Sequence, residues 1–362
     1  MTNTILNPGH FENNNSFTLF TLKSLILMYS MDENQNNEEQ NQQKPEKEPE
    51  TNFQGPIIVP IVHKYRLPIE PKINPTLAAV IGLIGGFILY QLFGSLLLIL
   101  VLGFDFQNAP PNSLRLIQMA GQLLFILLPA LILTKVIYED VTFVIRAHPV
   151  DFKLLSFFIL GMLILIPLMQ NYLYIQNVFI ERLAEKSAAI KSIKDALDGL
   201  NTLLEDQYSK IIVAKNALEV LLVVFVVSVI PALCEETMFR GFIQRSFEFT
   251  MTPFKAALLT AIFFALNHFN PYGLLPLIAL GLFFGFAAYK SNSIVVPMVL
   301  HFMNNFIAVV MYLAFGSEEL VDTKTMTNAE LGFASLSFIV LLTLFGLVVY
   351  LIRRYNSNKL II

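Results

Sequence analysis

The sequence contains few charged residues and a single cysteine. Only 14% of its 362 residues are Asp, Glu, Lys or Arg, and 55% are hydrophobic, whereas soluble proteins average roughly 25% charged residues. The net charge of -3 is too small to favour a nucleic-acid partner. Because Cys234 stands alone, an intramolecular disulfide and a cysteine-based zinc site are excluded. We therefore expect a polytopic membrane protein whose chemistry comes from Glu, Asp, His, Ser, Asn or Arg.

Several motifs of intramembrane hydrolases are also missing. The chain has no HExxH sequence for a helical zinc site, no GxGD for a di-aspartate protease and no GxSG for a rhomboid-like serine protease. It has no nucleotide-binding glycine loop and no internal repeat. Each of these absences removes one competing class of membrane enzyme.

Residues 1–74 differ in composition from the rest of the chain. The tract MDENQNNEEQNQQKPEKEPETNFQG is rich in Asn, Gln, Glu and Pro and nearly devoid of apolar residues, so burial cannot offset its ordering entropy. We expect residues 1–74 to form a disordered polar tail. The mildly apolar stretch before this tract is interrupted by Lys23 and makes a poor signal peptide. A start at Met28 or Met31 would make the first thirty or so residues a mis-annotation.

Apolar windows long enough to cross about 30 Å of hydrocarbon recur from Leu77 onward. Their approximate bounds are 77–102, 114–137, 154–173, 212–234, 254–268, 273–290, 294–315 and 330–352. The predicted fold class is an all-α polytopic membrane protein with about eight transmembrane helices. This helical domain would cover residues 75–352, followed by a short C-terminal tail at 353–362. Eight spans place both termini on one side, and the Lys and Arg residues near those ends predict that it is the cytoplasmic side.

The segment 174–211 does not fit the pattern of apolar windows, because it carries many residues of both charges. Its apolar residues recur at helical spacing, at Ile190, Ile193, Leu197 and Leu200. We expect an extramembrane amphipathic helix or a helical hairpin, with Asp198 and Gly199 offering a bend.

Polar residues in the later windows form pairs at one-turn spacing. Glu236 and Arg240 are four residues apart with the acid first, which is the favourable order for a helical ion pair. His301 and Asn305 are also four apart and project from one face of the seventh window. His268 closes the fifth window. Ionisable residues within a membrane span are costly and usually functional, so these side chains are the first candidates for a site.

Glu235 and Glu236 are expected to have different roles. Neighbouring helical residues point about 100° apart, so the two carboxylates cannot both face Arg240. The simplest division makes Glu236 and Arg240 a neutralised structural pair. It leaves Glu235, with His268 and His301, free for chemistry.

Three kinds of chemistry suit such a set. Glu235 beside a histidine can take a proton from water, and the histidine can stabilise the charge or return the proton to a leaving amine. Glu235, His268 and His301 could equally hold a zinc ion with an open position for water. Asn305 could donate a hydrogen bond to the oxyanion that forms when water attacks a carbonyl. All three describe amide hydrolysis, and they leave metal dependence open.

Non-catalytic interpretations also remain open. Histidines within spans serve as interhelical hydrogen-bonding groups worth about 0.6 to 2 kcal/mol each, and the charged group from Glu235 to Arg240 is also consistent with a solvated helix end. A protein that keeps these residues only as a hydrogen-bonded core would be a non-catalytic scaffold. Because Glu and His within spans also form proton relays, a proton-coupled transporter is a third hypothesis.

Three motifs occur in order along successive windows. EETMFRGFIQ begins at Glu235 and contains EExxxR, FALNH ends at His268 and contains FxxxH, and HFMNN begins at His301 and contains HxxxN. Together they resemble the CPBP family of intramembrane proteases, also called the Abi or CAAX-protease family, which includes the CAAX prenyl endopeptidases. The resemblance covers about residues 210–310 and extends neither to the tail nor to the segment 174–211.

The resemblance implies a role for each motif residue: water activation by Glu235 and His268, oxyanion stabilisation by His301 and Asn305, and support of the site by Glu236 and Arg240. Members are widely named metalloproteases, while a glutamate-dependent mechanism without a catalytic metal is also argued for the family. The implied cofactor is therefore either none or a divalent metal such as zinc. The implied substrate is a membrane-embedded or lipidated protein or peptide. Many bacterial relatives are linked to bacteriocin immunity, so a non-catalytic immunity protein is the alternative function. We expect the protein to lie in a bacterial inner membrane.

The predicted windows contain one geometric conflict. His301 lies about seven residues, roughly 10 Å, into its window from the cytoplasmic side, whereas His268 lies about fourteen residues, roughly 21 Å, from that side. The two imidazoles would not meet at these depths. One boundary is therefore expected to be wrong, and the linker around Thr252 and Pro253 is the first suspect.

Overall fold

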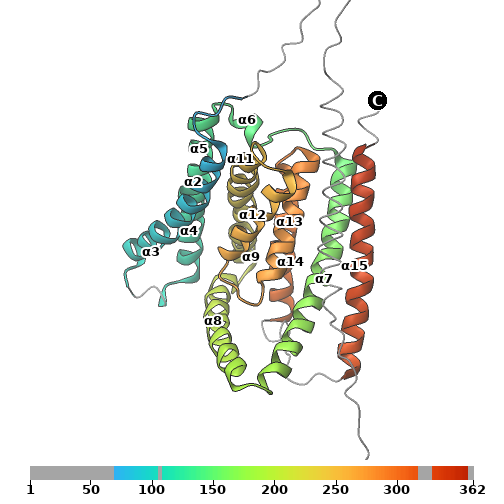
Figure 1. The fold of residues 1–362 in the computed structure, drawn as a ribbon. Coiled ribbons are helices and arrows are strands. Elements are labelled where there is room, and N and C mark those ends of the chain that lie inside the picture. The colour runs from blue at the N-terminus through green and yellow to red at the C-terminus, as the bar shows by residue number, and fades with distance from the viewer. Residues whose placement is uncertain (1–68, 105–107, 317–327, 358–362) are drawn as a thin grey trace, which may run out of the picture. The chain divides into compact units, whose positions relative to one another are not determined.

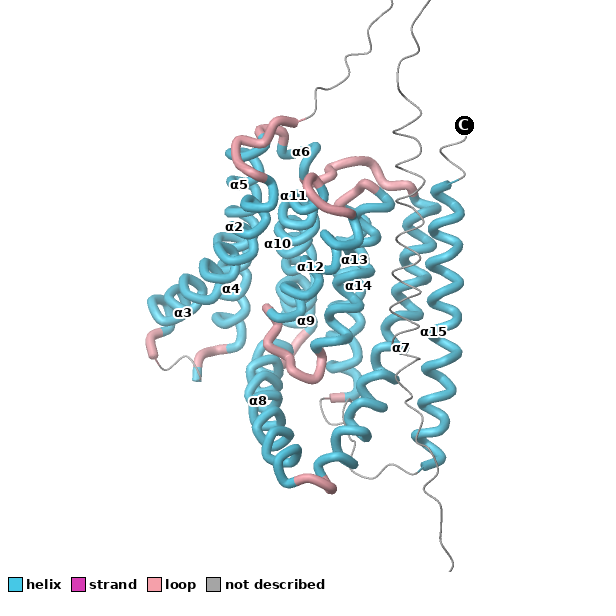
Figure 2. Tube along the Cα trace, viewed as in Figure 1, coloured by secondary structure: helices cyan, strands magenta, loops and turns pink. Residues whose placement is uncertain are grey.

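The computed structural model describes residues 69–104, 108–316 and 328–357, and every regular element within those ranges is a helix (Figure 1). Figure 2 shows the same bundle with helices joined by short loops. This confirms the predicted all-α class. The predicted polar tail, apart from residues 69–74, lies outside the described residues.

Seven helical stretches in this part of the chain are long and apolar enough to cross a membrane. They are α2–α3 (Pro75–Leu102), α4–α5 (Pro111–Tyr138), α7 (Phe152–Ala184), α9–α11 (Ala217–Glu248), α13 (Leu274–Ser291), α14 (Val295–Phe315) and most of α15 (Asn328–Ser357). Short π-helical segments interrupt three of them: η1 (Leu89–Phe93), η3 (Leu123–Leu127), η4 (Phe225–Val229) and η5 (Thr237–Gln244). The one-turn helix α6 (Val141–Val144) lies between α5 and α7.

One of the eight predicted windows, 254–268, does not contain a span. Its helix is α12 (Pro253–Leu266), with 14 residues. At 1.5 Å per residue it is ~21 Å long, too short for hydrocarbon about 30 Å thick. The bundle therefore consists of seven candidate spans and one half-length helix.

The fourth predicted window ends too early. The helix that begins at Ala217 continues through η5 and ends at Glu248, fourteen residues beyond the predicted end at 234. Glu236 and Arg240 consequently lie inside the helix and are fully buried, not at a solvated end. Two opposite charges that neutralise each other allow the helix to continue through apolar surroundings, which a hydropathy window cannot anticipate.

The longer fourth helix removes the conflict of depth. Helix α12 begins at Pro253, close to the predicted start at 254, and the Thr252 side chain caps it by accepting a hydrogen bond from the Lys255 amide. The suspected linker is therefore not the error. Glu235 lies thirteen residues before the end of α11 and His268 fifteen after the start of α12, which puts both ~20 Å from the same connection.

The connection between α13 and α14 lies inside the fold, which brings His301 to a similar depth. Ser293 and Ile294 in this connection are buried. The Ile294 amide donates to the Arg146 carbonyl at 2.9 Å, and the Ser293 hydroxyl donates to the His148 carbonyl at 2.8 Å. Because α14 begins beneath this loop, a residue only two turns along it can meet the middle of the fourth helix.

Helices α9–α14 form the middle of the bundle in Figure 1, with α2–α5 on one side and α7 and α15 on the other. Helix α7 packs along α15 and also contacts α13 and α14. Phe158 of α7 lies 5.7 Å from the ring of Phe283 and 5.6 Å from that of Phe286. The polar residues of the middle helices are thus enclosed by neighbours on both sides.

The segment 174–211 forms the end of α7 and the helix α8 (Ala188–Ile212). The residues at 188–211 form one helix, and the bend expected at Asp198 and Gly199 is wrong, because both residues lie inside α8. The chain turns at 185–187, where the Ser187 side chain accepts a hydrogen bond from the Ile190 amide and caps α8. A cap supplies the orphan amides of a helix start with a partner, whereas a single glycine only weakens a helix.

The two ends of the described chain lie at the same end of the bundle (Figure 1). The helical domain begins before residue 75, since Ile69 and Ile73 pack on the core and the Lys72 amide donates to the Ile137 carbonyl at 2.9 Å. At the other terminus α15 continues to Ser357, so the first residues of the predicted C-terminal tail are helical.

Close packing in the middle of the bundle yields a first testable prediction. A Cβ at Gly285 of α13 would lie 2.7 Å from Oε1 of Gln244 and 2.9 Å from Cβ of Ala257. We expect Gly285→Ala to destabilise the protein by about 1–3 kcal/mol, because α12 would have to move. Gly346→Ala is the matched control, since nothing lies within 4 Å of its added Cβ. Thermal unfolding in detergent measures the difference, and equal stabilities would contradict the packing.

Candidate active site

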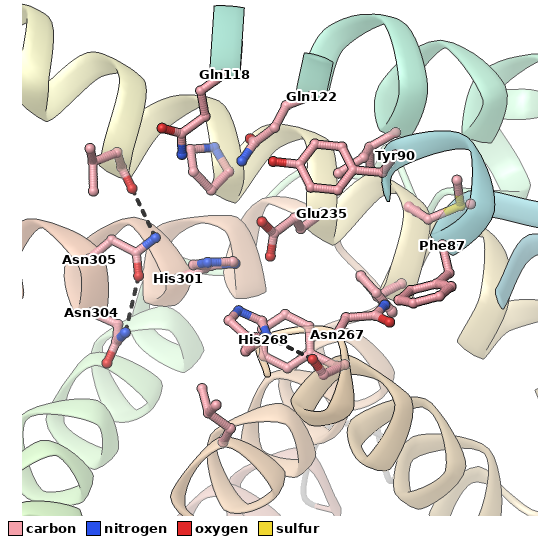
Figure 3. A pocket seen from close by; sticks show the side chains of 18 of the residues that line it. Phe87, Tyr90, Gln118, Gln122, Glu235, Asn267, His268, His301, Asn304 and Asn305 are labelled. Carbon is pink, nitrogen blue, oxygen red and sulfur yellow. Dashed lines mark hydrogen bonds between the residues drawn. The ribbon is translucent and has the colours of Figure 1, made fainter. Parts of the chain in front are cut away.

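A cavity of about 340 Å³ lies between the middle helices and the α2–α5 group. Its lining includes Glu235, His268, His301 and Asn305, four of the candidates from the sequence (Figure 3). Glu236 and Arg240 do not line it and are fully buried behind its wall. The structure thus brings the candidates together while separating the two adjacent glutamates.

Glu236 and Arg240 form the ion pair expected from their spacing. Nη1 of Arg240 donates to Oε1 of Glu236 at 2.8 Å, and Nη2 donates to the Gly281 carbonyl at 3.1 Å. The guanidinium also lies 4.5 Å from the ring centre of Phe264 and 5.2 Å from that of Phe284, a favourable arrangement for a buried cation. The positive charge of Arg240 is therefore stabilised by groups inside the protein and not by solvent.

His301 is the third member of this buried group, and the sequence did not predict its contact. Its Nδ1 lies 2.7 Å from Oε1 of Glu236, and its ring stacks on Phe284 at 5.4 Å. A carboxylate only accepts hydrogen bonds, so Nδ1 of His301 must carry a proton. The second ring nitrogen, Nε2, takes no part in this contact. Glu236 therefore sets the orientation and the tautomer of His301.

His268 follows the end of α12 and is oriented by the last turn of that helix. Its Nδ1 lies 2.7 Å from the carbonyl oxygen of Phe264, one turn earlier in α12. A carbonyl can only accept, so Nδ1 again carries the proton, and Nε2 of a neutral ring is left as a base. Phe264 packs on the ring at 4.6 Å. Both histidines thus have a fixed Nδ1 and a second nitrogen available for chemistry.

Glu235 is the acidic residue of the cavity. Among the described lining residues it alone is Asp or Glu, and it is partly exposed there. Its Oε2 is buried and has no hydrogen-bond partner within the described ranges. Figure 3 shows its carboxylate, with the rings of His268 and His301, around one shared space. A carboxylate without a neutralising partner beside two imidazoles is suited to take a proton from water.

Asn305 lies one turn beyond His301 and has part of its amide in use. Its Nδ2 donates to the Val227 carbonyl at 3.0 Å, and its Oδ1 accepts from Nδ2 of Asn304 at 3.1 Å. An amide nitrogen carries two hydrogens, so one remains for a ligand in the cavity. These two contacts fix the plane of the amide, which a preorganised donor requires.

The zinc alternative does not fit this arrangement. Among the residues that the structure describes, no three His, Cys, Asp or Glu side chains lie close enough together to hold one metal ion. A zinc site needs its nitrogen and oxygen ligands at about 2.0–2.2 Å from a common centre. Glu235, His268 and His301 face one space but do not form such a site as placed.

The cavity also contains polar residues that the sequence interpretation missed. Gln118 and Gln122 of α4 face Glu235 across it (Figure 3), and the Gln122 side chain lies within hydrogen-bonding reach of the Tyr90 hydroxyl. The side-chain oxygens of both glutamines are buried without a partner in the described part of the chain. Their spacing of four, inside an apolar window, was the available signal, since it places both amides on one helix face.

A second, mostly apolar cavity of about 470 Å³ adjoins the first. It lies between α2 and the connection from α12 to α13, and it shares Leu83, Phe87 and Asn267 with the first cavity. Phe87 and Phe269 border it with ring centres 6.1 Å apart. An apolar group could therefore lie beside the polar site without entering water.

Comparison with known proteins gives a family match for the middle of the chain. Residues 217–307 match the family model described as Rce1-like, the type II CAAX prenyl endopeptidases. Neither the curated proteins nor the solved structures gave a significant match. The matched residues run from the start of α9 into α14 and include all six motif residues. This match supports the resemblance to the CPBP family of CAAX-type intramembrane proteases over residues 217–307.

Proposed function

We propose that this protein hydrolyses a peptide bond of a membrane-associated protein or peptide, with water activated by Glu235 and His268. The observation that carries the proposal is the separation of the two glutamates. Glu236 forms an ion pair with Arg240 behind the cavity wall, whereas Glu235 lines the cavity. Two adjacent acids in different environments are the arrangement expected of one structural and one reacting group.

The proposed reaction begins with a water molecule between the carboxylate of Glu235 and Nε2 of His268. Glu235 accepts a proton as the water oxygen attacks the scissile carbonyl carbon, and the carbonyl oxygen becomes an oxyanion. When the carbon–nitrogen bond breaks, the same proton passes to the leaving amine. His268 orients the water and stabilises the protonated carboxyl group.

The oxyanion is proposed to bind between Asn305 and His301. The free N–H of Asn305 donates directly. His301 already donates through Nδ1 to Glu236, so it donates through Nε2 to the oxyanion only when both ring nitrogens carry a proton. A donor that is fixed before the reaction avoids reorganisation at the transition state.

The second cavity supports a substrate with an apolar part. Its lining between α2 and the α12–α13 connection is mainly Leu, Ile and Phe, and we propose that it holds a lipid chain or an apolar segment while the peptide bond lies at Glu235. We further propose a bacterial inner membrane with cytoplasmic termini. Basic residues near the end of the bundle where α2 begins support this orientation, among them Lys135, Lys153, Arg353 and Arg354.

The direct test is cleavage by the purified protein in liposomes. A fluorogenic peptide with a farnesylated CAAX end and the same peptide without lipid are the two probes. We expect cleavage by the wild type, and a ~10²–10³-fold lower kcat for Asn305→Ala because one oxyanion donor is lost. Asn171→Ala is the matched control, since Asn171 lies in α7 and donates to the Pro167 carbonyl. Failure to cut either peptide would favour the scaffold or immunity interpretation.

A further inference from the structure

The connection that carries His268 is irregular and needs support from outside its own helix. Residues 267–273 join α12 to α13, and Phe269 has a φ of 51°. A positive φ is a strained conformation for a bulky residue and persists only where neighbouring structure holds it. The amides of His268 and Phe269 make only single-turn bonds, to the carbonyls of Ala265 and Leu266, both at 3.2 Å.

Tyr272 is the point at which this connection is held. Its hydroxyl donates to Oδ1 of Asp198 in α8 at 2.5 Å, and its carbonyl accepts from Nε2 of Gln176 in α7 at 3.0 Å. Both partners belong to the predicted insert, which lies outside the matched residues 217–307. The segment 174–211 therefore holds the connection 267–273 through both the side chain and the backbone carbonyl of Tyr272.

Asp198 is itself fixed in place by an ion pair. Nζ of Lys194 lies 2.7 Å from Oδ2 of Asp198 and 3.0 Å from Oε2 of Glu181 in α7. Burial alone would raise the pKa of Asp198, but the hydrogen bonds from Lys194 and Tyr272 outweigh it and lower that pKa. Burial and the hydrogen bond to Asp198 raise the pKa of Tyr272 to about 12, so its hydroxyl stays a donor.

The other end of α8 is attached to the opposite wall of the cavity. Nε of Arg115 in α4 donates to the Ile211 carbonyl at 2.8 Å, and the Arg115 side chain is fully buried. Tyr208 and Ile212 of α8 line the cavity itself. Helix α8 thus connects the α4 wall with the connection that carries His268 (Figure 1).

We propose that α8 acts as a strap that positions His268, with Tyr272 and Asp198 as its positioning residues. The proposal rests on the proposed function, because a position of His268 matters to catalysis only if His268 acts on the water. Neither residue touches the reacting atoms. Both act through the connection 267–273, whose displacement would move the His268 ring away from Glu235.

The test combines kinetics with hydrogen exchange on the full-length protein in liposomes. We expect Tyr272→Phe and Asp198→Ala each to lower kcat about 10- to 100-fold with little change in KM, since a misplacement of ~1 Å costs up to about 10²-fold. Amide exchange in 267–273 should speed up several-fold while exchange in α13 and α14 stays unchanged. Asp198→Asn keeps an acceptor for Tyr272 and should retain much of the activity.

Controls separate the strap from a general loss of structure. Asp195→Ala changes an exposed acid one turn away on the same helix and should leave kcat and exchange unaltered. The double variant Tyr272→Phe/Asp198→Ala should have the same kcat as Asp198→Ala, because each single change already breaks the Tyr272–Asp198 hydrogen bond. If Tyr272→Phe and Asp198→Ala keep the wild-type kcat and the wild-type exchange rates, the strap proposal is wrong, while the proposed function still stands. A wild type that cleaves no peptide would overturn the proposed function, while the exchange data would still test whether α8 holds the connection.

Discussion

Glu235→Gln is expected to lower kcat by about 10²–10⁴-fold while leaving the fold unchanged. Glutamine keeps the size of the side chain but cannot accept the proton of the attacking water. Glu235 is partly exposed to the cavity and its Oε2 has no hydrogen-bond partner among the described residues, so the substitution breaks no hydrogen bond of that atom. Single-turnover cleavage of the farnesylated peptide in liposomes measures the effect, and the thermal unfolding curve checks the fold.

Two comparisons make this result specific to Glu235. Glu70→Gln alters an exposed glutamate outside the cavity and should cleave as fast as the wild type. Glu236→Gln should also reduce cleavage, but it should lower stability as well, because it leaves Arg240 and His301 with a weaker acceptor. If Glu235→Gln retains wild-type cleavage, Glu235 is not the base.

Arg240→Ala is expected to cause the largest loss of stability of any single change considered for this protein, about 3–5 kcal/mol. It leaves the carboxylate of Glu236 buried without its cation, and breaking a buried pair costs more than the pair contributes. Arg240 and Glu236 are both 0% exposed, so water cannot replace the lost contact. Folded yield and the temperature of thermal aggregation in detergent measure the loss.

Replacing both members of the Glu236–Arg240 ion pair by apolar residues separates the contribution of the pair to stability from its contribution to cleavage. Glu236→Leu combined with Arg240→Met removes both charges together and should recover part of the stability, since apolar groups can substitute for a buried ion pair. It should not recover cleavage, because Nδ1 of His301 loses its partner at 2.7 Å. Arg245→Ala, which removes a half-buried partner of Glu248, is the control. Arg240→Ala protein as abundant and heat-resistant as the wild type would refute the structural pair.

Some relations in the site follow from local helix geometry and could be read in advance. The spacing of four between Glu236 and Arg240 places both on one helix face, and the pair is present at 2.8 Å. The same geometry turns Glu235 about 100° away from its neighbour, towards the cavity. Periodicity and hydropathy likewise sufficed for an all-helical membrane bundle, because each apolar helix satisfies its own backbone hydrogen bonds.

Other relations depend on which helices pack together, and no local pattern carries that information. His301 is 65 positions from Glu236, yet their side chains form a hydrogen bond. The boundary at 234 failed because a neutralised pair permits charges inside a span. Tyr90, Gln118 and Gln122 join the cavity only because α2 and α4 pack against the middle helices.

The sequence alone determined the helical membrane class, the candidate residues Glu235, His268, His301 and Asn305, and the division between Glu235 and Glu236. These follow from composition and from the period of 3.6 residues, both properties of a short stretch of chain. Tertiary structure decided the common depth of the site, the partner of His301 and the link from α8 to Tyr272. Those depend on the length and packing of whole helices, because a hydrogen bond between distant residues forms only after both helices have been placed.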